Sequence, residues 1–150
     1  MEWTHNKQEV STPPKGFVGF IYCIEFLEGE YKKYTGKKNF YSKRKRNFGK
    51  KELALVTDKR LKKYEYVIKE SDWRTYTSSN KEVNERIKKG DAYNKFILGF
   101  ALDSKHLTYL EETHLHSSAA LWDDRYYNDN IAGRFFTKDV ERWEQIRKSV

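Results

Sequence analysis

The stretch from Gly16 to Thr35, GFVGFIYCIEFLEGEYKKYT, decides the fold. Its first part, Gly16 to Phe26, is rich in aromatic and β-branched residues, which predicts a β-strand. Leu27 to Glu30 contains a glycine and predicts a turn, and Tyr31 to Thr35 resumes an extended pattern. Together these segments predict a β-hairpin.

After the hairpin, the chain shows two helical signals. Apolar residues recur at helical spacing from Leu61 to Ile68, which predicts a short helix. Ser79 or Asn80 can cap a second helix, which runs to Lys89 and is ended by Gly90.

The remaining elements are a strand and two helices. Tyr93 to Leu102 reads as a third, central strand. Ser104 is the expected cap of a helix with the apolar positions Leu107, Leu110, Leu115 and Leu121. Thr137 is the expected cap of a closing helix with Val140, Trp143 and Ile146 on one face.

This order predicts an α+β domain in which helices flank a small three-stranded, mixed or antiparallel sheet. Residues 1–15 are polar and without periodicity, so a loosely ordered leader is expected there. Residues 16–136 are expected to form the folded domain. Residues 137–150 are expected to form a C-terminal helix that packs on this domain or extends it.

The positive charge is concentrated in one segment. The formal net charge is +8, but residues 32–63 hold fourteen Lys or Arg and two acids, a net of +12. Such a segment favours a polyanionic partner, because each neutralised phosphate releases condensed counterions. No clear amphipathic helix accompanies it, which favours nucleic acid over an anionic membrane.

Cysteine content and hydropathy narrow the protein class further. A single cysteine, Cys23, excludes an intramolecular disulfide and a cysteine-based zinc cluster. The sequence shows neither a signal peptide nor an apolar stretch long enough to span a bilayer. We therefore expect a cytoplasmic protein without membrane association.

Two short motifs carry a family resemblance. Phe20-Ile21-Tyr22, followed twelve residues later by Tyr34-Thr35-Gly36, resembles the pair of strand motifs that names the GIY-YIG nuclease family. Arg44 lies ten residues after Tyr34, where the family places an arginine on its first helix. Leu110-Glu111 falls where the family has a metal-binding glutamate, and Tyr127 to Ile131 where it has an asparagine.

Longer stretches resemble the Seg-type endonucleases of T4-like phages, namely GFIYCI, KYTGKKNF, SDWRTYTSS, YLE and YYNDNIAGRFF. The resemblance spans about Gly16 to Phe136. The sequence departs from the pattern where Phe20 replaces a glycine, Thr35 an aliphatic residue and Thr77 a frequent glycine. None of these changes removes a charged or catalytic group.

The resemblance implies a GIY-YIG fold over residues 16–136 and a homing-type endonuclease that hydrolyses DNA with Mg²⁺ or Mn²⁺. If the chain is phage-encoded, its location is the host cytoplasm. Two alternatives stay open: a structure-selective nuclease acting on branched DNA, and a DNA-binding module of the same fold that does not cut. Cutting both strands requires a dimer on DNA or two successive nicks.

The resemblance also assigns roles to the side chains that handle the water and the phosphate. Tyr22 would help to deprotonate the attacking water, with Tyr34 in support. Arg44 would contact the scissile phosphate, since a guanidinium can donate two hydrogen bonds to its oxygens. Lys37 would support the same phosphate, and Arg46 is a rival to Arg44.

Glu111 is the expected metal ligand, because a carboxylate is a hard oxygen donor. Glu112 is the alternative, and it points about 100° away around the helix, so only one of the two can face the site. Asn130 and Asn128 compete for the family's asparagine role of orienting a metal-bound water or the leaving group. The wider DNA-binding surface is expected to use Lys38, Lys43, Lys45, Arg46, Lys50 and Lys51.

Overall fold

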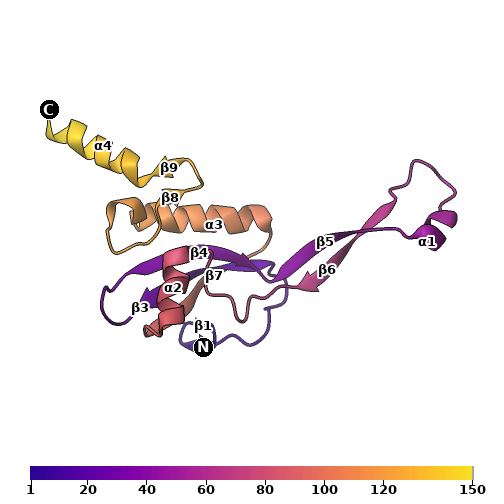
Figure 1. Ribbon diagram of the computed structural model, residues 1–150, viewed down its shortest axis with the longest axis horizontal. Helices are drawn as coiled ribbons and strands as arrows, with labels where there is room; N and C mark the ends of the chain where they lie inside the picture. Colours follow the sequence, from indigo (N-terminus) through magenta and orange to yellow (C-terminus); the bar gives the residue numbers. More distant parts are fainter. Residues whose placement is uncertain (150) are drawn as a thin grey trace.

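The computed structural model describes residues 1–149 and confirms an α+β fold with a mixed sheet flanked by helices (Figure 1). The main sheet has five strands in the order β2-β1-β7-β3-β4, and not the three that were expected. Strand β3 (Gly19–Phe26) pairs antiparallel with both β4 (Lys33–Asn39) and β7 (Tyr93–Ala101). The predicted hairpin and the third strand are therefore confirmed.

The two additional strands come from the segment that was expected to be a loose leader. Strand β1 (Thr4–His5) pairs parallel with β7, and β2 (Gln8–Glu9) pairs antiparallel with β1. Trp3 is fully buried, and its indole N–H donates a hydrogen bond to the carbonyl of Trp73 at 2.6 Å. Residues 1–10 thus contribute to the sheet and to its core.

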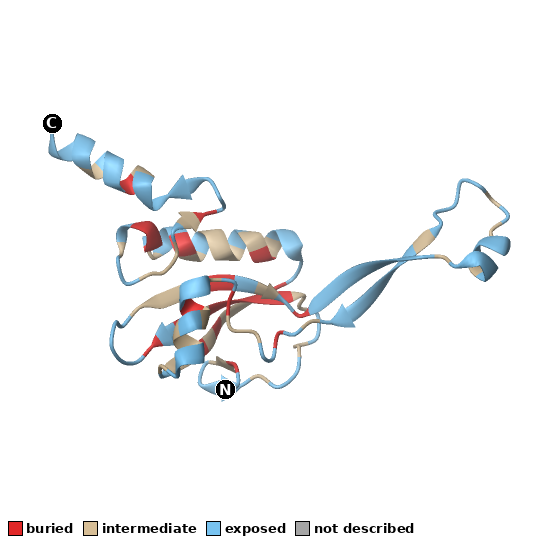
Figure 2. Ribbon diagram, viewed as in Figure 1, coloured by how far each residue is buried: buried red, intermediate tan, exposed pale blue. Residues whose placement is uncertain are grey.

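Side chains of β3 alternate between the two faces of the sheet, as strand geometry requires. Phe20, Tyr22, Ile24 and Phe26 point into the larger core, where α2 (Lys81–Lys89) contributes Val83. On the other face, α3 (Ser104–Ser117) packs its Leu107 against Ile21 and Ala101, and the three form a smaller core. The buried residues accordingly follow the strands and the inner sides of these helices (Figure 2).

The ends of α2 follow the predicted signals. The side chain of Asn80 accepts a hydrogen bond from the Val83 N–H at 3.1 Å, so Asn80 and not Ser79 is the N-cap. Gly90 ends the helix in the left-handed conformation, with φ +102°.

The caps expected at the other two helices were wrong. Helix α3 is capped by Asp103, whose carboxylate accepts from the His106 N–H at 2.7 Å, and Ser104 is already helical. Helix α4 (Thr137–Lys148) follows Phe136, whose N–H donates to the Asp139 carboxylate at 3.0 Å. In both cases a carboxylate satisfies an N–H at the positive end of the helix, where negative charge is stabilising.

The basic segment forms a projecting arm, defined here as residues 41–70. It consists of a hairpin of β5 (Tyr41–Asn47) and β6 (Tyr64–Glu70), with α1 (Lys50–Ala54) near its tip. The arm extends away from the body (Figure 1), and none of its residues is buried (Figure 2). The helix predicted over residues 61–68 was wrong, because residues 64–68 form cross-strand pairs with β5.

The last part of the chain closes a third small core. The 3-10 helix η1 (Ala120–Trp122) follows α3, so Leu121 lies beyond the helix in which it was expected. Strands β8 (Asn130–Ile131) and β9 (Phe135–Phe136) form a short hairpin, and Ile131 packs with Leu115 and Val140. No helix among residues 1–149 combines the length and the apolarity needed to cross a membrane.

Candidate active site

A polar cavity of about 320 Å³ lies at the β4 edge of the main sheet. Three segments that are distant in sequence meet there: the start of α2, the middle of α3 and the loop that leads into β8. The residues that line it are Tyr34, Thr35, Ser79, Asn80, Glu111, Leu115, Asn128, Asp129, Asn130 and Ala132. The cavity therefore gathers Tyr34, Glu111 and both candidate asparagines of the sequence analysis.

Glu111 is the half-buried carboxylate of this cavity. Burial raises the pKa of Glu111 above its usual range, the charge of Lys37 partly offsets this, and Glu112 adds to it. Glu112 does not line the cavity. The helix thus turns one of the two adjacent carboxylates into the site, where a cation would stabilise its charged form.

Lys37 brings a positive charge to the same region. It follows the YTG motif in β4, and its ammonium donates a hydrogen bond to the Thr108 hydroxyl at 2.9 Å. Thr108 precedes Glu111 by three residues, so the two lie on one side of α3. The ammonium is therefore anchored beside Glu111.

Tyr22 lies beneath the cavity and does not line it. Its side chain is fully buried, and its hydroxyl lies near the side chains of Tyr76 and Ser78 but makes no hydrogen bond of good geometry with any described residue. The ring packs against Gly36, where an added Cβ would lie 2.6 Å from the Tyr22 hydroxyl oxygen. Glycine in the second motif is thus required for close packing against the tyrosine of the first motif.

Tyr34 is the tyrosine that reaches the cavity, with its ring centroid 6.3 Å from that of Tyr22. Burial raises the pKa of both phenols, and the charges of Glu111 and Asp129 add to the increase at Tyr34. Both phenols are therefore protonated at neutral pH in this environment. They can donate a hydrogen bond, and loss of the proton requires a neighbouring cation.

The side chains of both candidate asparagines are occupied by hydrogen bonds. Asn128 accepts from the Thr35 N–H at 3.0 Å and donates to the Thr35 carbonyl at 2.8 Å. Asn130 donates to the Asp129 carboxylate at 2.7 Å and accepts from the Gly133 N–H at 3.0 Å. Asn128 therefore joins the loop to β4, whereas Asn130 shapes its own turn.

Arg44 lies on β5 in the arm, and not on a helix as expected. Its place in the exposed hairpin, opposite Val67, leaves it outside the residues that line the cavity. The spacing of ten residues from Tyr34 therefore did not predict the position of Arg44, because the chain leaves the main sheet after Phe40 and enters the arm.

The residues expected to bind DNA spread from the base of the arm to its tip. A second hollow of about 450 Å³ at the base is lined by Lys37, Lys38, Asn39, Tyr41, Ser42, Lys43, Ser71 and Ser104. Lys45 and Arg46 continue along β5, and Lys50 and Lys51 begin α1. Lys38 is engaged by Asp72 at 2.6 Å, and the Arg46 guanidinium is held by two carboxylates, those of Glu52 and Glu65.

A family comparison agrees with this geometry. The sequence model described as "Putative endonuclease segE, GIY-YIG domain" matches residues 3–131. The chain belongs to this family. The match to the GIY-YIG domain includes the N-terminal strands, the arm and every segment that lines the cavity. Searches of curated proteins and of solved structures gave no match.

The cavity of this GIY-YIG domain offers oxygen donors that suit Mg²⁺ or Mn²⁺. Glu111 and the exposed Asp129 supply carboxylates, and no group of three or more His, Cys, Asp or Glu side chains converges within residues 1–149. Mg²⁺ keeps several waters and is commonly held through one or two carboxylates, so the donor set fits such an ion. It does not fit zinc, which prefers three or four nitrogen or sulfur ligands.

Sequence reasoning did not single out Ser79 or Asp129 as site residues. Ser79 and Asn80 had been considered only as helix caps, and the cap position is what brings the start of α2 to the cavity. Asp129 stands between the two asparagines in a turn-rich segment. Its position beside Asn128 and Asn130 was the one available signal.

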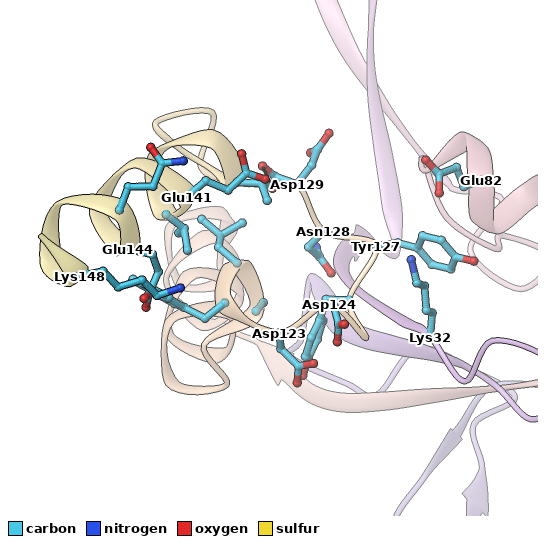
Figure 3. Close-up of a pocket in the computed structure, with 17 residues that line it drawn as sticks. Lys32, Glu82, Asp123, Asp124, Tyr127, Asn128, Asp129, Glu141, Glu144 and Lys148 are labelled. Carbon is cyan, nitrogen blue, oxygen red and sulfur yellow. Dashed lines mark hydrogen bonds between the residues drawn. The ribbon is translucent and has the colours of Figure 1, made fainter.

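A larger hollow of the domain, about 680 Å³, lies on the other side of the 123–129 segment and faces α4 (Figure 3). Six carboxylates and two lysines line it: Glu82, Asp123, Asp124, Asp129, Glu141 and Glu144, with Lys32 and Lys148. This excess of negative charge repels phosphate. The smaller cavity beside Lys37 is therefore the better candidate for contact with DNA.

Proposed function

We propose that the chain is a metal-dependent endodeoxyribonuclease that hydrolyses phosphodiester bonds at the cavity beside β4. The observation that carries this proposal is the half-buried Glu111 carboxylate, which stands in a polar cavity next to Lys37 in a domain of the endonuclease family. A buried carboxylate in a phosphate-binding site is repulsive unless a cation accompanies it.

In this proposal, Glu111 holds Mg²⁺ or Mn²⁺, with Asp129 as the second oxygen donor. Such an ion neutralises phosphoryl charge and lowers the pKa of a bound water. Lys37 supports the scissile phosphate from beside the carboxylate. Its ammonium is held by Thr108, which fixes its position before DNA binds.

The two tyrosines act on protons in the proposed reaction. Tyr34 lies in the cavity and is placed to exchange a proton with the attacking water. Tyr22 lies behind it, and its unpartnered hydroxyl is available to Tyr34 or to a water that enters the site. The positive charges of Lys37 and of a cation held by Glu111 would counteract the raised pKa values of the phenols.

Asn128 and Asn130 have positioning roles in this proposal. Asn128 fixes the loop against Thr35 and so holds Asp129 at the cavity. Asn130 holds the next turn through Gly133. We assign Arg44 to a phosphate outside the cavity, because it lies on the exposed arm.

The resemblance of the sequence to Seg-type proteins supports a homing-type role in a phage. One cavity per chain cleaves one strand at a time, so double-strand cleavage needs two copies on the DNA or two successive events.

The test is cleavage of supercoiled plasmid in Mg²⁺ by the wild type and two matched variants, with an EDTA control. Glu111→Gln is expected to abolish nicking and linearisation, whereas Glu112→Gln, one position away and outside the cavity, is expected to cut normally. Equal cleavage by wild type and Glu111→Gln would refute the assigned ligand.

Branched and linear duplexes complete the experiment. Preferential cutting of the branched duplex would identify a structure-selective nuclease. If the wild type shifts these DNAs on a gel but cuts none of them in Mg²⁺ or Mn²⁺, the chain is a binding module and the nuclease proposal is wrong.

A further inference from the structure

The arm carries nearly all of the net positive charge of the chain. Residues 41–70 contain eleven Lys or Arg and four acids, a net of +7, against +8 for all 150 residues. None of these residues is buried, and both faces of the β5–β6 hairpin are open (Figure 2). An isolated two-stranded hairpin is at best marginally stable in water, so contact with a partner would stabilise this arm.

One face of the hairpin combines lysines with aromatic side chains. The pairing places Lys43 opposite Ile68 and Lys45 opposite Tyr66 on this face, with Tyr64 next to them. The ammonium of Lys43 lies 4.3 Å from the Tyr66 ring centroid, and that of Lys45 lies 4.0 Å from the Tyr64 ring centroid. The rings therefore support the ammonium groups without neutralising them.

The charges on the opposite face are partly neutralised. Arg46 is held by Glu52 near the tip and by Glu65 on β6. On the lysine face, the one acid in the described pairs is Glu70 at the base, and its carboxylate accepts from the Trp73 indole at 2.7 Å. On the opposite face, Arg44 and Lys69 form no ion pair with a described residue, so each face keeps two unpaired basic side chains, and the tyrosine rings are what distinguish the lysine face.

We propose that the arm lies in a groove of duplex DNA, with the face of Lys43, Lys45, Tyr64 and Tyr66 toward the phosphates and bases. This inference rests on the proposed function for the identity of the partner. The major groove admits a two-stranded β-ribbon, and free lysines beside it neutralise phosphates. The exposed tyrosine hydroxyls beside the lysines can donate hydrogen bonds to phosphate oxygens, which position a protein on the duplex without reading its sequence.

The arm also fixes where the duplex lies relative to the cavity. Lys37, beside Glu111, lines the hollow at the base of the arm together with Lys43, so positive charge is continuous from the cavity to β5. Seven residues of strand span about 24 Å, or about seven base pairs along the groove. The cut is therefore expected at one end of the stretch that the arm contacts.

The arm can be removed without opening the body. The Ser71 N–H donates to the Phe40 carbonyl at 2.8 Å, so the two ends of residues 41–70 are already paired, and a Gly-Gly turn can join them. Circular dichroism and thermal melting of the excised protein test whether the body remains folded.

The experiment measures binding of a labelled linear duplex by fluorescence anisotropy in EDTA, where no cleavage occurs, over a series of salt concentrations. The wild type is compared with the arm-excised protein, with Lys43→Ala/Lys45→Ala, and with Lys88→Ala/Lys89→Ala. The last variant removes two exposed lysines from the end of α2 and controls for net charge. If the excised protein fails to fold, the double variants still decide the question.

Loss of two phosphate contacts reduces the slope of log K against log salt by about 1.8, and weakens binding roughly 60-fold at about 0.1 M salt relative to a 1 M reference. We expect this for Lys43→Ala/Lys45→Ala and at least as much for the excised protein, with little change for Lys88→Ala/Lys89→Ala. Unchanged binding without the arm would overturn the inference and leave the DNA-binding function standing. A wild type that binds no duplex at any salt concentration would overturn both.

Discussion

Removal of one buried atom, the hydroxyl oxygen of Tyr22, is expected to change stability and activity in opposite directions. This hydroxyl has no hydrogen-bond partner among the described residues, and a buried polar group without a partner costs about 1–3 kcal/mol. Tyr22→Phe removes the hydroxyl and leaves the ring packed against Trp3 and Tyr76, at centroid distances of 5.2 and 5.9 Å. We expect the free energy of unfolding to rise by about 1 kcal/mol.

For a chain of this length, that gain corresponds to a rise in Tm of roughly 2–4 °C, which differential scanning calorimetry resolves. Plasmid cleavage by the same variant is expected to fall strongly if the hydroxyl takes part in proton transfer. More stability with less activity is the signature of a group retained for function.

Tyr127→Phe is the matched control. The Tyr127 hydroxyl is paired with the Arg86 guanidinium at 3.2 Å, so its removal is expected to lower the Tm rather than raise it. If Tyr22→Phe were destabilised to the same extent as Tyr127→Phe, the Tyr22 hydroxyl would have a partner in solution. If Tyr22→Phe cut plasmid at the wild-type rate, its assigned role in proton transfer would be wrong.

Three further changes test the packing and the charge at the site. Gly36→Ala places a Cβ 2.6 Å from the Tyr22 hydroxyl and is expected to lower the free energy of unfolding in urea by about 1–3 kcal/mol. The control Gly99→Ala, whose Cβ would lie 3.9 Å from Ile21, is expected to lose much less. Equal losses for the two variants would contradict the close approach at Gly36. Trp3→Ala is expected to cost about 3–5 kcal/mol by the same assay, whereas a loose leader would show no change. Because folding raises the pKa of Glu111, the protonated carboxyl stabilises the folded state. This contribution to the free energy of unfolding is fully present below the unfolded pKa and is lost as pH rises through the folded pKa. Glu111→Gln in EDTA should therefore gain stability relative to the wild type as the pH rises above the unfolded pKa of about 4.3, and a difference that stays constant with pH would refute the shift.

The parts of the fold that the sequence predicted are those specified by neighbouring residues. The β3–β4 hairpin follows from alternating apolar residues around a glycine turn, and β7 from a continuous apolar run. Helix α2 follows from its caps, because Asn80 and Gly90 act within one turn of the helix.

The parts that it missed depend on distant contacts or on exposure. Trp3 is hydrogen-bonded to Trp73, seventy residues away, and the local pattern of residues 1–15 does not predict that contact. The arm has no buried face, so β6 lacks the alternation that marks a strand against a core. Four apolar or aromatic residues in that segment therefore matched helical spacing by chance.

The candidate site divides in the same way. The family motifs led to Tyr34, Glu111 and the two asparagines, which the structure gathers at one cavity. Arg44 was placed by its spacing from Tyr34, and this failed because the chain leaves the body between the two residues. The partner of Asn128 lies 93 residues away on β4, and only tertiary structure reveals it.

The pairing of Asn128 with Thr35 also bears on self-association. Strand β4 ends the main sheet, and an open strand edge invites another chain to add a strand. Here the loop before β8 occupies that edge: Lys33 exchanges backbone hydrogen bonds with Arg125 and Tyr127, and the Asn128 amide takes both bonding groups of Thr35. The side-chain amide of Asn128 thus makes the two hydrogen bonds that a neighbouring strand would make with Thr35. It blocks strand addition by another chain at this point of the edge. A second copy that meets the first on DNA cannot add a strand at Lys33 to Thr35 unless it displaces this loop.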